Sequence, residues 1–331
     1  MHMADALISP VVGGTMMAIS GGLIAYSVRK IRKNFDESRI PLMGVVGAFV
    51  FAAQMINFAI PGTGSSGHIG GAVLLAVLLG AAPAFIVMAS VLLVQALFFA
   101  DGGLLAWGCN LFNMGFFGCF LAYPYIFRPL VGKSKSRVRV FVASIIACLV
   151  SLELGAFAVT LETLASGVTE LPLNAFLVAM LPIHLAIGLG EGLATGAVLL
   201  FVYENLPESE TLKLEEKKFS LLNLTWVFGL AAAVLGGGLS LLASEKPDGL
   251  EWSMERVAGS SELEATGGVH DAFSRFSEFF AVLPDYAFPG SESWFGTSFS
   301  GIVGGVLCVV VLFFLAKIIC GRKGNDKELQ E

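Results

Sequence analysis

Long apolar stretches separated by short polar segments dominate this chain. They cover residues 8–28, 41–60, 69–83, 84–100, 104–127, 138–162, 173–203, 221–243 and 297–319. A helix needs about 20 mostly apolar residues to cross the hydrocarbon core of a bilayer, so the pattern predicts nine membrane-spanning helices. Pro83 and the glycines near it divide the third stretch from the fourth, and the seventh is long enough to tilt or to break around Pro182. The expected fold class is an all-α polytopic membrane protein.

The composition agrees with this prediction. Apolar residues make up 56% of the chain and charged residues only 14%, whereas soluble domains carry about 25% charged residues. Small residues recur at four-residue spacing in Gly14-Ala18-Gly22 and in Gly188-Gly192-Gly196, a pattern typical of close helix contact. These stripes favour packing within the chain, with docking of a partner as the alternative. The composition indicates that the protein is surrounded by lipid, and it gives no sign of a nucleic-acid partner.

The basic residues predict the orientation. Seventeen of the 20 lysines and arginines fall in four segments, at 29–39, 128–139, 213–218 and 317–327. With nine spans all four segments lie on one side, which the positive-inside rule identifies as cytoplasmic. We therefore expect the N-terminus and the loop around His68 outside, and the C-terminus in the cytoplasm.

A polar segment divides the chain into two expected modules. Residues 1–205 form a seven-span module, 206–219 a cytoplasmic linker, and 220–331 a two-span module. Between the last two spans lies an acidic extracellular segment, 245–292, with ten acidic residues against three basic ones. Its role is not readable from the sequence. The five cysteines form no C-x-x-C pair, so we expect small buried side chains rather than disulfides or a zinc site.

His2 directly follows the first residue. The chain shows no cleavable signal peptide of the usual form, so we take Met1 as the mature first residue. An α-amine, the next backbone nitrogen and the His2 imidazole can chelate one metal in fused rings, with three nitrogens in a plane. A fourth nitrogen would complete a square plane, a geometry that suits Ni(II) or Cu(II), whereas zinc prefers tetrahedral sites. The alternative is that a histidine at position 2 is there by chance.

His68 is the best candidate for the fourth nitrogen. It lies in GTGSSGHIGG, residues 62–71, on the same predicted side as the N-terminus. A loop rich in glycine can adopt backbone conformations closed to other residues and fold tightly around a small ion. A solvated loop histidine is the alternative interpretation.

Four segments resemble one known family. MHMADALISP, GTGSSGHIGG, ADGGLLAWGCNLFNMGFFG (100–118) and HLAIGLGEGLATG (184–196) are similar to the CbiM/NikM family. These proteins are the substrate-binding membrane components of energy-coupling-factor (ECF) transporters for cobalt and nickel. The resemblance covers about residues 1–205 and implies a seven-span substrate-binding (S) component that holds Ni²⁺ or Co²⁺ through the Met1 amine, the His2 amide and imidazole, and the His68 imidazole.

A further motif, PDGLEWS (247–253), resembles the opening of the PDGLE-type, NikN-like accessory component found with nickel-type members. It favours nickel over cobalt. The resemblance also implies partners, a transmembrane coupling (T) subunit and a pair of cytoplasmic ABC ATPases. GKS at 132–134 is no nucleotide-binding loop, because Phe127 stands where that motif requires glycine. We therefore expect a transport component rather than an enzyme, with ATP hydrolysis on other subunits.

Other polar residues within the spans are weaker candidates, because ionisable groups in a bilayer are costly and usually functional. His184 and Glu191 are seven residues apart on one helix face, and Glu153 is a possible partner from the preceding span. They indicate either a metal path or a hydrogen-bond network that fixes packing. Asn110 and Asn113 are candidates for hydrogen bonds around the metal. Asp5 is a candidate for orienting the N-terminal segment.

Two other function classes stay open. The first is a proton-coupled secondary metal carrier that uses Glu153, His184 and Glu191, although no internal repeat of the kind common in such carriers is evident. The second is an intramembrane hydrolase, for which Ser65 and Ser66 lie near His68. No G-x-S-x-G or H-E-x-x-H motif supports it.

Overall fold

The fold is described from a computed structural model of residues 1–331. The description covers all residues except 35, 134–135, 170, 206–217, 262, 264–266, 291–292 and 329–331. Most of the expected linker 206–219, with Lys213 and Lys217, therefore lies outside the described residues.

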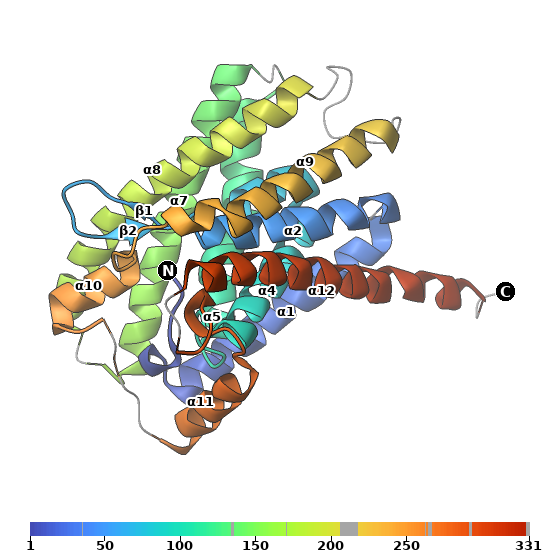
Figure 1. The fold of residues 1–331 in the computed structure, drawn as a ribbon. Helices are drawn as coiled ribbons and strands as arrows, with labels where there is room; N and C mark the ends of the chain where they lie inside the picture. The colour runs from blue at the N-terminus through green and yellow to red at the C-terminus, as the bar shows by residue number, and fades with distance from the viewer. Residues whose placement is uncertain are drawn as a thin grey trace.

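Helices account for almost all of the regular structure (Figure 1). The long ones are α1 (Pro10–Asn34), α2 (Ile40–Gln54), α4 (Ala81–Phe98), α7 (Arg137–Ser166), α8 (Leu173–Asn205), α9 (Lys218–Gly237) and α12 (Trp294–Glu328). Three elements follow one another without a break, namely α5 (Trp107–Leu111), the π-helical η3 (Phe112–Phe127) and α6 (Arg128–Val131). The shorter helices are η1 (Asp5–Leu7), η2 (Glu37–Arg39), α3 (Ala72–Leu79), η4 (Leu239–Leu242), α10 (Gly249–Ala258), α11 (Gly268–Phe280) and η5 (Pro284–Tyr286). A small antiparallel hairpin pairs β1 (Phe58–Ala59) with β2 (Ser66–Gly67).

Every predicted apolar stretch contains helix, but the helices differ in length. Six in the described part of the chain are long and apolar enough to cross a membrane, at Pro10–Lys33, Ala81–Phe98, Trp107–Val131, Arg137–Ser166, Leu173–Glu204 and Trp294–Cys320. The apolar helix Leu221–Gly237 is shorter, and so are α2 and α3. The structure thus supports a mainly helical membrane protein with six candidate spans.

The third and fourth apolar stretches are divided at Gly80, one of the glycines near Pro83, with φ of 87°. Pro83 lies in the first turn of α4, where its missing N–H costs no hydrogen bond. Pro182 lies inside α8, which continues through it as one helix from Leu173 to Asn205.

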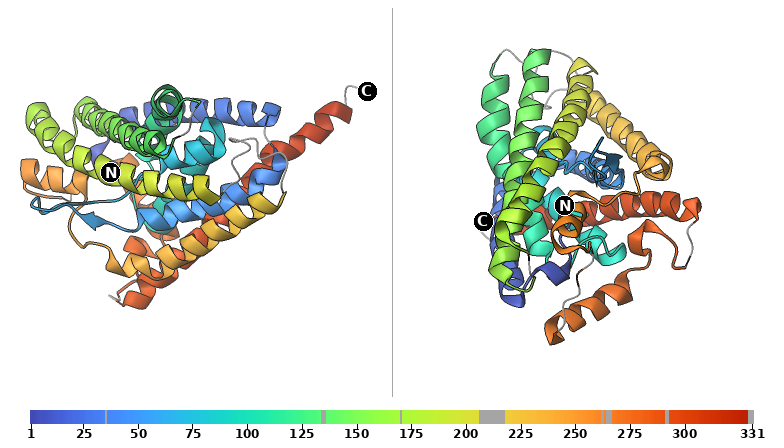
Figure 2. Two further views of the ribbon diagram at one scale, coloured as in Figure 1. Left: turned by 90° about the horizontal axis from the view of Figure 1, so that it is seen from above. Right: turned by 90° about the vertical axis from the view of Figure 1, so that its left-hand side faces the viewer.

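Close helix contacts are built on glycine. Gly188, Gly192 and Gly196 of α8 face Leu149, Ile145 and Phe141 of α7. The two helices run side by side (Figure 2). This stripe therefore serves packing within the chain, as expected. Gly14 and Gly22 of the other stripe face open space.

The C-terminal helices pack tightly onto the N-terminal part. Phe49 of α2 meets Phe228 of α9 with ring centroids 5.1 Å apart. A side chain added at Gly47 of α2 would overlap Leu312 of α12, and one added at Gly304 would overlap Phe51. α2 is therefore held between α9 and α12, and the two parts of the chain share one core.

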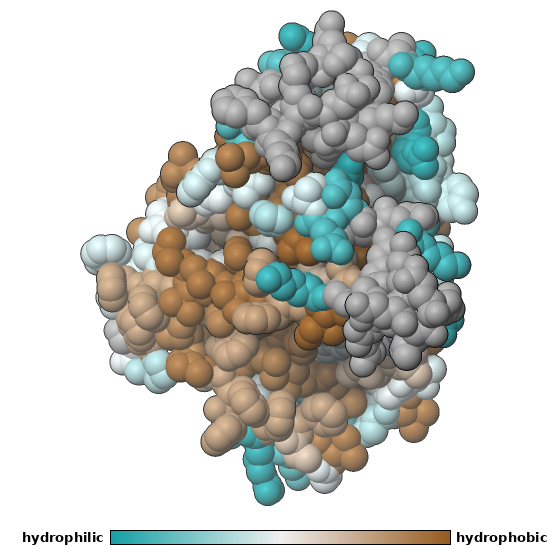
Figure 3. All heavy atoms as spheres, turned by 90° about the vertical axis from the view of Figure 1, so that its right-hand side faces the viewer, coloured by the Kyte–Doolittle hydropathy of each residue, from teal (hydrophilic) through white to brown (hydrophobic). Residues whose placement is uncertain are grey.

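Much of the outer surface is apolar. Large exposed apolar side chains lie on α7, α8, α9 and α12, among them Phe157, Val178, Trp226, Leu230 and Phe314. Figure 3 shows one face on which apolar side chains gather in a broad area, with polar side chains toward its edges. A surface of this kind fits contact with lipid. The five cysteines are all free and buried, as expected.

Segments predicted as cytoplasmic lie close to one another. Arg32 of α1 donates from Nε to the carbonyl of Ile319 in α12, at 3.2 Å. Arg137, at the start of α7, pairs with Glu204, near the end of α8, at 3.4 Å. Figure 1 shows the C-terminus projecting to one side, well away from the N-terminus.

Candidate metal site

The N-terminal segment lies in the interior and is held through its backbone. Met3 donates its N–H to Oδ1 of Asn110 at 2.7 Å, and Asn110 Nδ2 donates back to the Met3 carbonyl at 3.0 Å. The N–H of Gly103 also donates to the Met3 carbonyl, at 2.8 Å. Asn110 comes from α5 and is buried. Met1 and His2 are thus placed by a neighbour with fixed hydrogen bonds on both sides.

Asp5 fastens the same segment two residues further along the chain. Its carboxylate accepts a hydrogen bond from the N–H of Ala106 at 2.9 Å. Burial raises the pKa of Asp5, and backbone N–H groups around it act in the opposite direction. A side chain added at Gly103 would overlap both the carboxylate and the backbone nitrogen of Asp5. Only a residue without Cβ lets the segment lie this close.

His68 points toward the chain's amine. Its Nε2 lies 3.1 Å from the Met1 nitrogen, and its Nδ1 lies 3.1 Å from the carbonyl oxygen of Ile69. Because that carbonyl only accepts, Nδ1 carries the hydrogen, and the Nε2 lone pair is directed at the amine. Ser65 and Ser66 donate their hydroxyls to backbone carbonyls and not to His68. This arrangement argues against the hydrolase alternative.

His2 lies next to His68 but points elsewhere. The two rings stack with centroids 5.0 Å apart and planes 20° from parallel. His2 Nδ1 lies 3.2 Å from Oδ1 of Asp101, and Nε2 is buried without a partner. Burial lowers the pKa of both imidazoles, which favours the neutral form that can bind a metal. Chelation by the amine, amide and imidazole would require His2 to turn away from Asp101.

A carboxylate from the distant C-terminal part completes the cluster. Asp248 Oδ2 lies 2.5 Å from the Met1 amine and 4.0 Å from His68 Nε2. Burial acts to raise the pKa of Asp248, but the ammonium and His68 hold it well below its usual value. In the described part of the chain no three His, Cys, Asp or Glu side chains converge on one point. A metal held here would use main-chain nitrogens as well as imidazoles.

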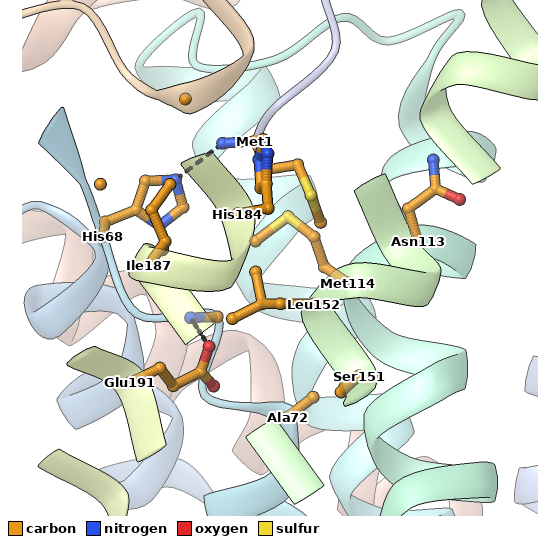
Figure 4. A pocket seen from close by; sticks show the side chains of 13 residues that line it. Met1, His68, Ala72, Asn113, Met114, Ser151, Leu152, His184, Ile187 and Glu191 are labelled. Atoms are coloured by element: carbon orange, nitrogen blue, oxygen red, sulfur yellow. Dashed lines mark hydrogen bonds between the residues drawn. The ribbon is translucent and has the colours of Figure 1, made fainter. Parts of the chain in front are cut away.

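A small cavity adjoins this cluster (Figure 4). Its volume of about 20 Å³ is enough for one water molecule or an ion. His184 and Glu191 of α8 line it with Met1 and His68. His184 Nε2 is buried there without a partner, while Nδ1 lies 2.8 Å from the Met180 carbonyl.

The other candidate residues predicted from the sequence have different partners. Glu191 accepts hydrogen bonds from the N–H groups of Gly70 and Gly71, at 3.0 and 2.8 Å, and so braces the loop after His68. Asn113 lines the cavity and donates to Glu162 at 2.7 Å. Glu153 is not among the residues that line it, and its Oε1 is buried without a partner. The structure therefore joins His184 and Glu191 around one cavity but does not bring Glu153 to them.

Sequence reasoning missed three residues, Asp101, Asp248 and Tyr286. Asp101 stands alone beside the apolar run 84–100, and Asp248 stands within the PDGLE motif, so each carried a local signal. Tyr286 donates its hydroxyl to Oδ2 of Asp101 at 2.5 Å, and nothing in its sequence neighbourhood indicates this role.

Two family models match the chain in succession. Residues 2–209 match the cobalt uptake substrate-specific transmembrane region, and residues 222–321 match the PDGLE domain. The chain is 30% identical over 317 residues to a putative fused nickel transport protein NikMN of Archaeoglobus fulgidus, covering 96% of this chain and 98% of that protein. It is also 30% identical to the fused nickel transport protein NikMN of Rhodobacter capsulatus, covering 87% of this chain and 88% of that protein.

A solved structure is similar to this chain over part of its length. It is a truncated transition metal transporter, 31% identical, with a TM-score of 0.55, and the match covers 62% of this chain and 99% of that one. Fold and comparisons together define a membrane protein of metal transport. The chain belongs to the CbiM/NikM family, the cobalt uptake substrate-specific transmembrane proteins, with a PDGLE domain of NikN type fused to it.

Proposed function

We propose that this protein captures Ni²⁺ or Co²⁺ for an ATP-driven uptake transporter of the energy-coupling-factor type. The metal is the transported substrate, and its ligands are the Met1 amine, the His2 amide and imidazole, and the His68 imidazole. The observation that carries the proposal is the 3.1 Å distance between the amine and His68 Nε2. Two neighbouring ligand atoms of a square plane, each about 2 Å from the metal, lie about this far apart.

Metal binding replaces contacts that the ligands make without it. The amine gives up one proton and the His2 amide gives up its N–H proton, both to solvent, and His2 turns its Nδ1 from Asp101 to the metal. His68 keeps its hydrogen bond to Ile69, which fixes the tautomer and ring orientation that a ligand needs. Asn110, Asn113 and Asp5 act around the site, and His184 with Glu191 line the cavity beyond it.

The proposed setting is a prokaryotic cell membrane with the metal site facing outward. Seven spans of the family's substrate-binding component and two of the PDGLE part would put the N-terminus outside and the C-terminus in the cytoplasm. The short α2, α3 and Leu221–Gly237 would complete the nine spans. A coupling subunit and ABC ATPases would supply the energy. Nickel is preferred over cobalt because of the square-planar donor set and the fused nickel transport relatives.

The proton-coupled carrier has less support. It needs Glu153, His184 and Glu191 to act together, and the cavity joins only the last two.

The test is calorimetric titration of the purified chain, with its native N-terminus, by Ni²⁺ and by Co²⁺. We expect one tight site, with Ni²⁺ the stronger ligand. In His68→Ala the affinity should fall by about 100-fold or more, because even groups that only support a ligand are worth about 10–100-fold. The matched control Thr63→Ala loosens the same loop without removing a nitrogen donor and should change the affinity by less than about threefold. Tight binding that persists in His68→Ala would contradict the proposed site.

A further inference from the structure

The described parts of segment 245–288, within the PDGLE domain, cover the candidate metal site. Ser66 donates its N–H to the Pro247 carbonyl at 2.8 Å and its hydroxyl to the Lys246 carbonyl at 2.6 Å. Trp252 donates from Nε1 to the Thr63 carbonyl at 3.0 Å. The loop that carries His68 is therefore bound directly to the start of this segment.

The same segment also reaches the N-terminal residues. In α11, Nε2 of His270 lies 2.9 Å from the carbonyl oxygen of Ile8. Tyr286 holds Asp101, which in turn lies beside His2. The PDGLE domain thus holds a residue next to each histidine of the site, namely Ser66 near His68 and Asp101 beside His2.

Asp248 is aimed at the site by its own helix. Its Oδ1 accepts hydrogen bonds from the N–H groups of Leu250 and Glu251, at 2.8 and 3.0 Å, and so caps the start of α10. With one oxygen fixed in this way, the other faces the Met1 amine. The side chains of Met1 and Asp248 are 5% and 13% exposed, so the pair is largely shielded from water.

The charges favour a lasting role for this carboxylate. Before metal binds, it faces an ammonium of charge +1. Afterwards it would face a dication bound to one deprotonated amide, which also sums to +1. The carboxylate therefore suits both states electrostatically, and a buried charge is stable only with such a partner.

We propose that the PDGLE domain completes the substrate site, with Asp248 as the residue that positions the amine beside His68 and attracts the incoming dication. This inference rests on the proposed function. It gives the acidic segment a defined task, because one of its carboxylates, that of Asp248, is part of the site.

The experiment compares two variants that each remove one negative charge from the same helical turn. Asp248→Asn keeps a side-chain oxygen that can cap α10, but it loses the charge facing the amine. Glu251→Gln, the matched control, removes the charge of the capping-box partner. Glu251 Oε2 accepts from the Asp248 N–H, and the hydrogen bonds of the amine in the described structure are to His68 and Asp248 instead. Both are made in the full chain and titrated with Ni²⁺, and the absorption spectrum of each Ni²⁺ complex is recorded.

We expect Asp248→Asn to weaken Ni²⁺ binding by about tenfold or more, with the spectrum of the four-nitrogen complex unchanged. Glu251→Gln should stay within about threefold of the native affinity. Equal affinities in Asp248→Asn and the native chain would overturn the inference and leave the proposed function standing. A spectrum altered in Asp248→Asn would also overturn it, since it would mean that the ligand set itself had changed. If the native chain binds neither Ni²⁺ nor Co²⁺, the proposed function and the inference both fall.

Discussion

Insertion of two alanines between Met1 and His2 should abolish tight Ni²⁺ binding. The two fused chelate rings require the imidazole to stand on the residue directly after the free amine. A single alanine would place the histidine third, where the amine, two amides and the imidazole can hold Ni²⁺ in a square plane by themselves. Two alanines leave every side chain in the sequence intact but separate the amine from the imidazole by too many residues for either chelate. We expect the affinity to fall by about 100-fold or more, beyond the 10–100-fold that supporting groups contribute.

The measurement is the same Ni²⁺ titration, with the thermal midpoint of the metal-free protein as the control for folding. The inserted residues lie before Met3, so the hydrogen bonds of Met3 to Asn110 and Gly103 can stay in place. The midpoint should therefore change little while binding is lost. Unchanged affinity in the insertion variant would show that the amine is not a ligand.

Gly103→Ala should have the second largest effect. The methyl group would overlap the carboxylate and the backbone nitrogen of Asp5. Because Asp5 lies in the short helix η1 and is tied to Ala106, the overlap cannot be relieved by turning one side chain. The N-terminal segment must shift, and the amine and His2 shift with it. We expect Ni²⁺ affinity to fall by about 10–100-fold, since a displaced ligand set loses the supporting contacts.

The matched control is Gly22→Ala in α1. A methyl group there meets open space, and replacing glycine within a helix by alanine is stabilising by roughly 0.5–1 kcal/mol. Its Ni²⁺ affinity should equal that of the native chain. If Gly103→Ala also bound Ni²⁺ with native affinity, the close approach of the N-terminal segment to Gly103 would not matter for the site.

The sequence predicts the helices well, because apolar stretches of membrane length are a strong signal. It divided the third and fourth stretches by Pro83 and the glycines near it. The break lies at Gly80, whose positive φ suits glycine, while Pro83 is tolerated in the first turn of α4. The sequence does not show that α2 is held between α9 and α12, because such packing depends on contacts between residues far apart in the chain.

In the site too, features that depend on local sequence were predicted and contacts between distant residues were not. Met1, His2 and His68 were singled out because their chemistry can be read from residue type and position, and the structure brings them together. Asp248 was missed because 247 positions separate it from the amine. Only the fold reveals that the PDGLE motif meets the N-terminus. From the sequence, the acidic segment is characterised only by its net charge of about −7. The structure shows that one of its carboxylates, that of Asp248, lies beside the Met1 amine.

X-ray absorption at the nickel edge of the Ni²⁺-loaded protein tests the central claim most directly, because it reports the number, type and arrangement of the metal's ligands. We predict four nitrogen donors in a square plane, supplied by the amine, the His2 amide, the His2 imidazole and His68, with no bound water. A six-coordinate spectrum dominated by oxygen donors would contradict the account, since it would place the metal on carboxylates and water instead of on the N-terminus.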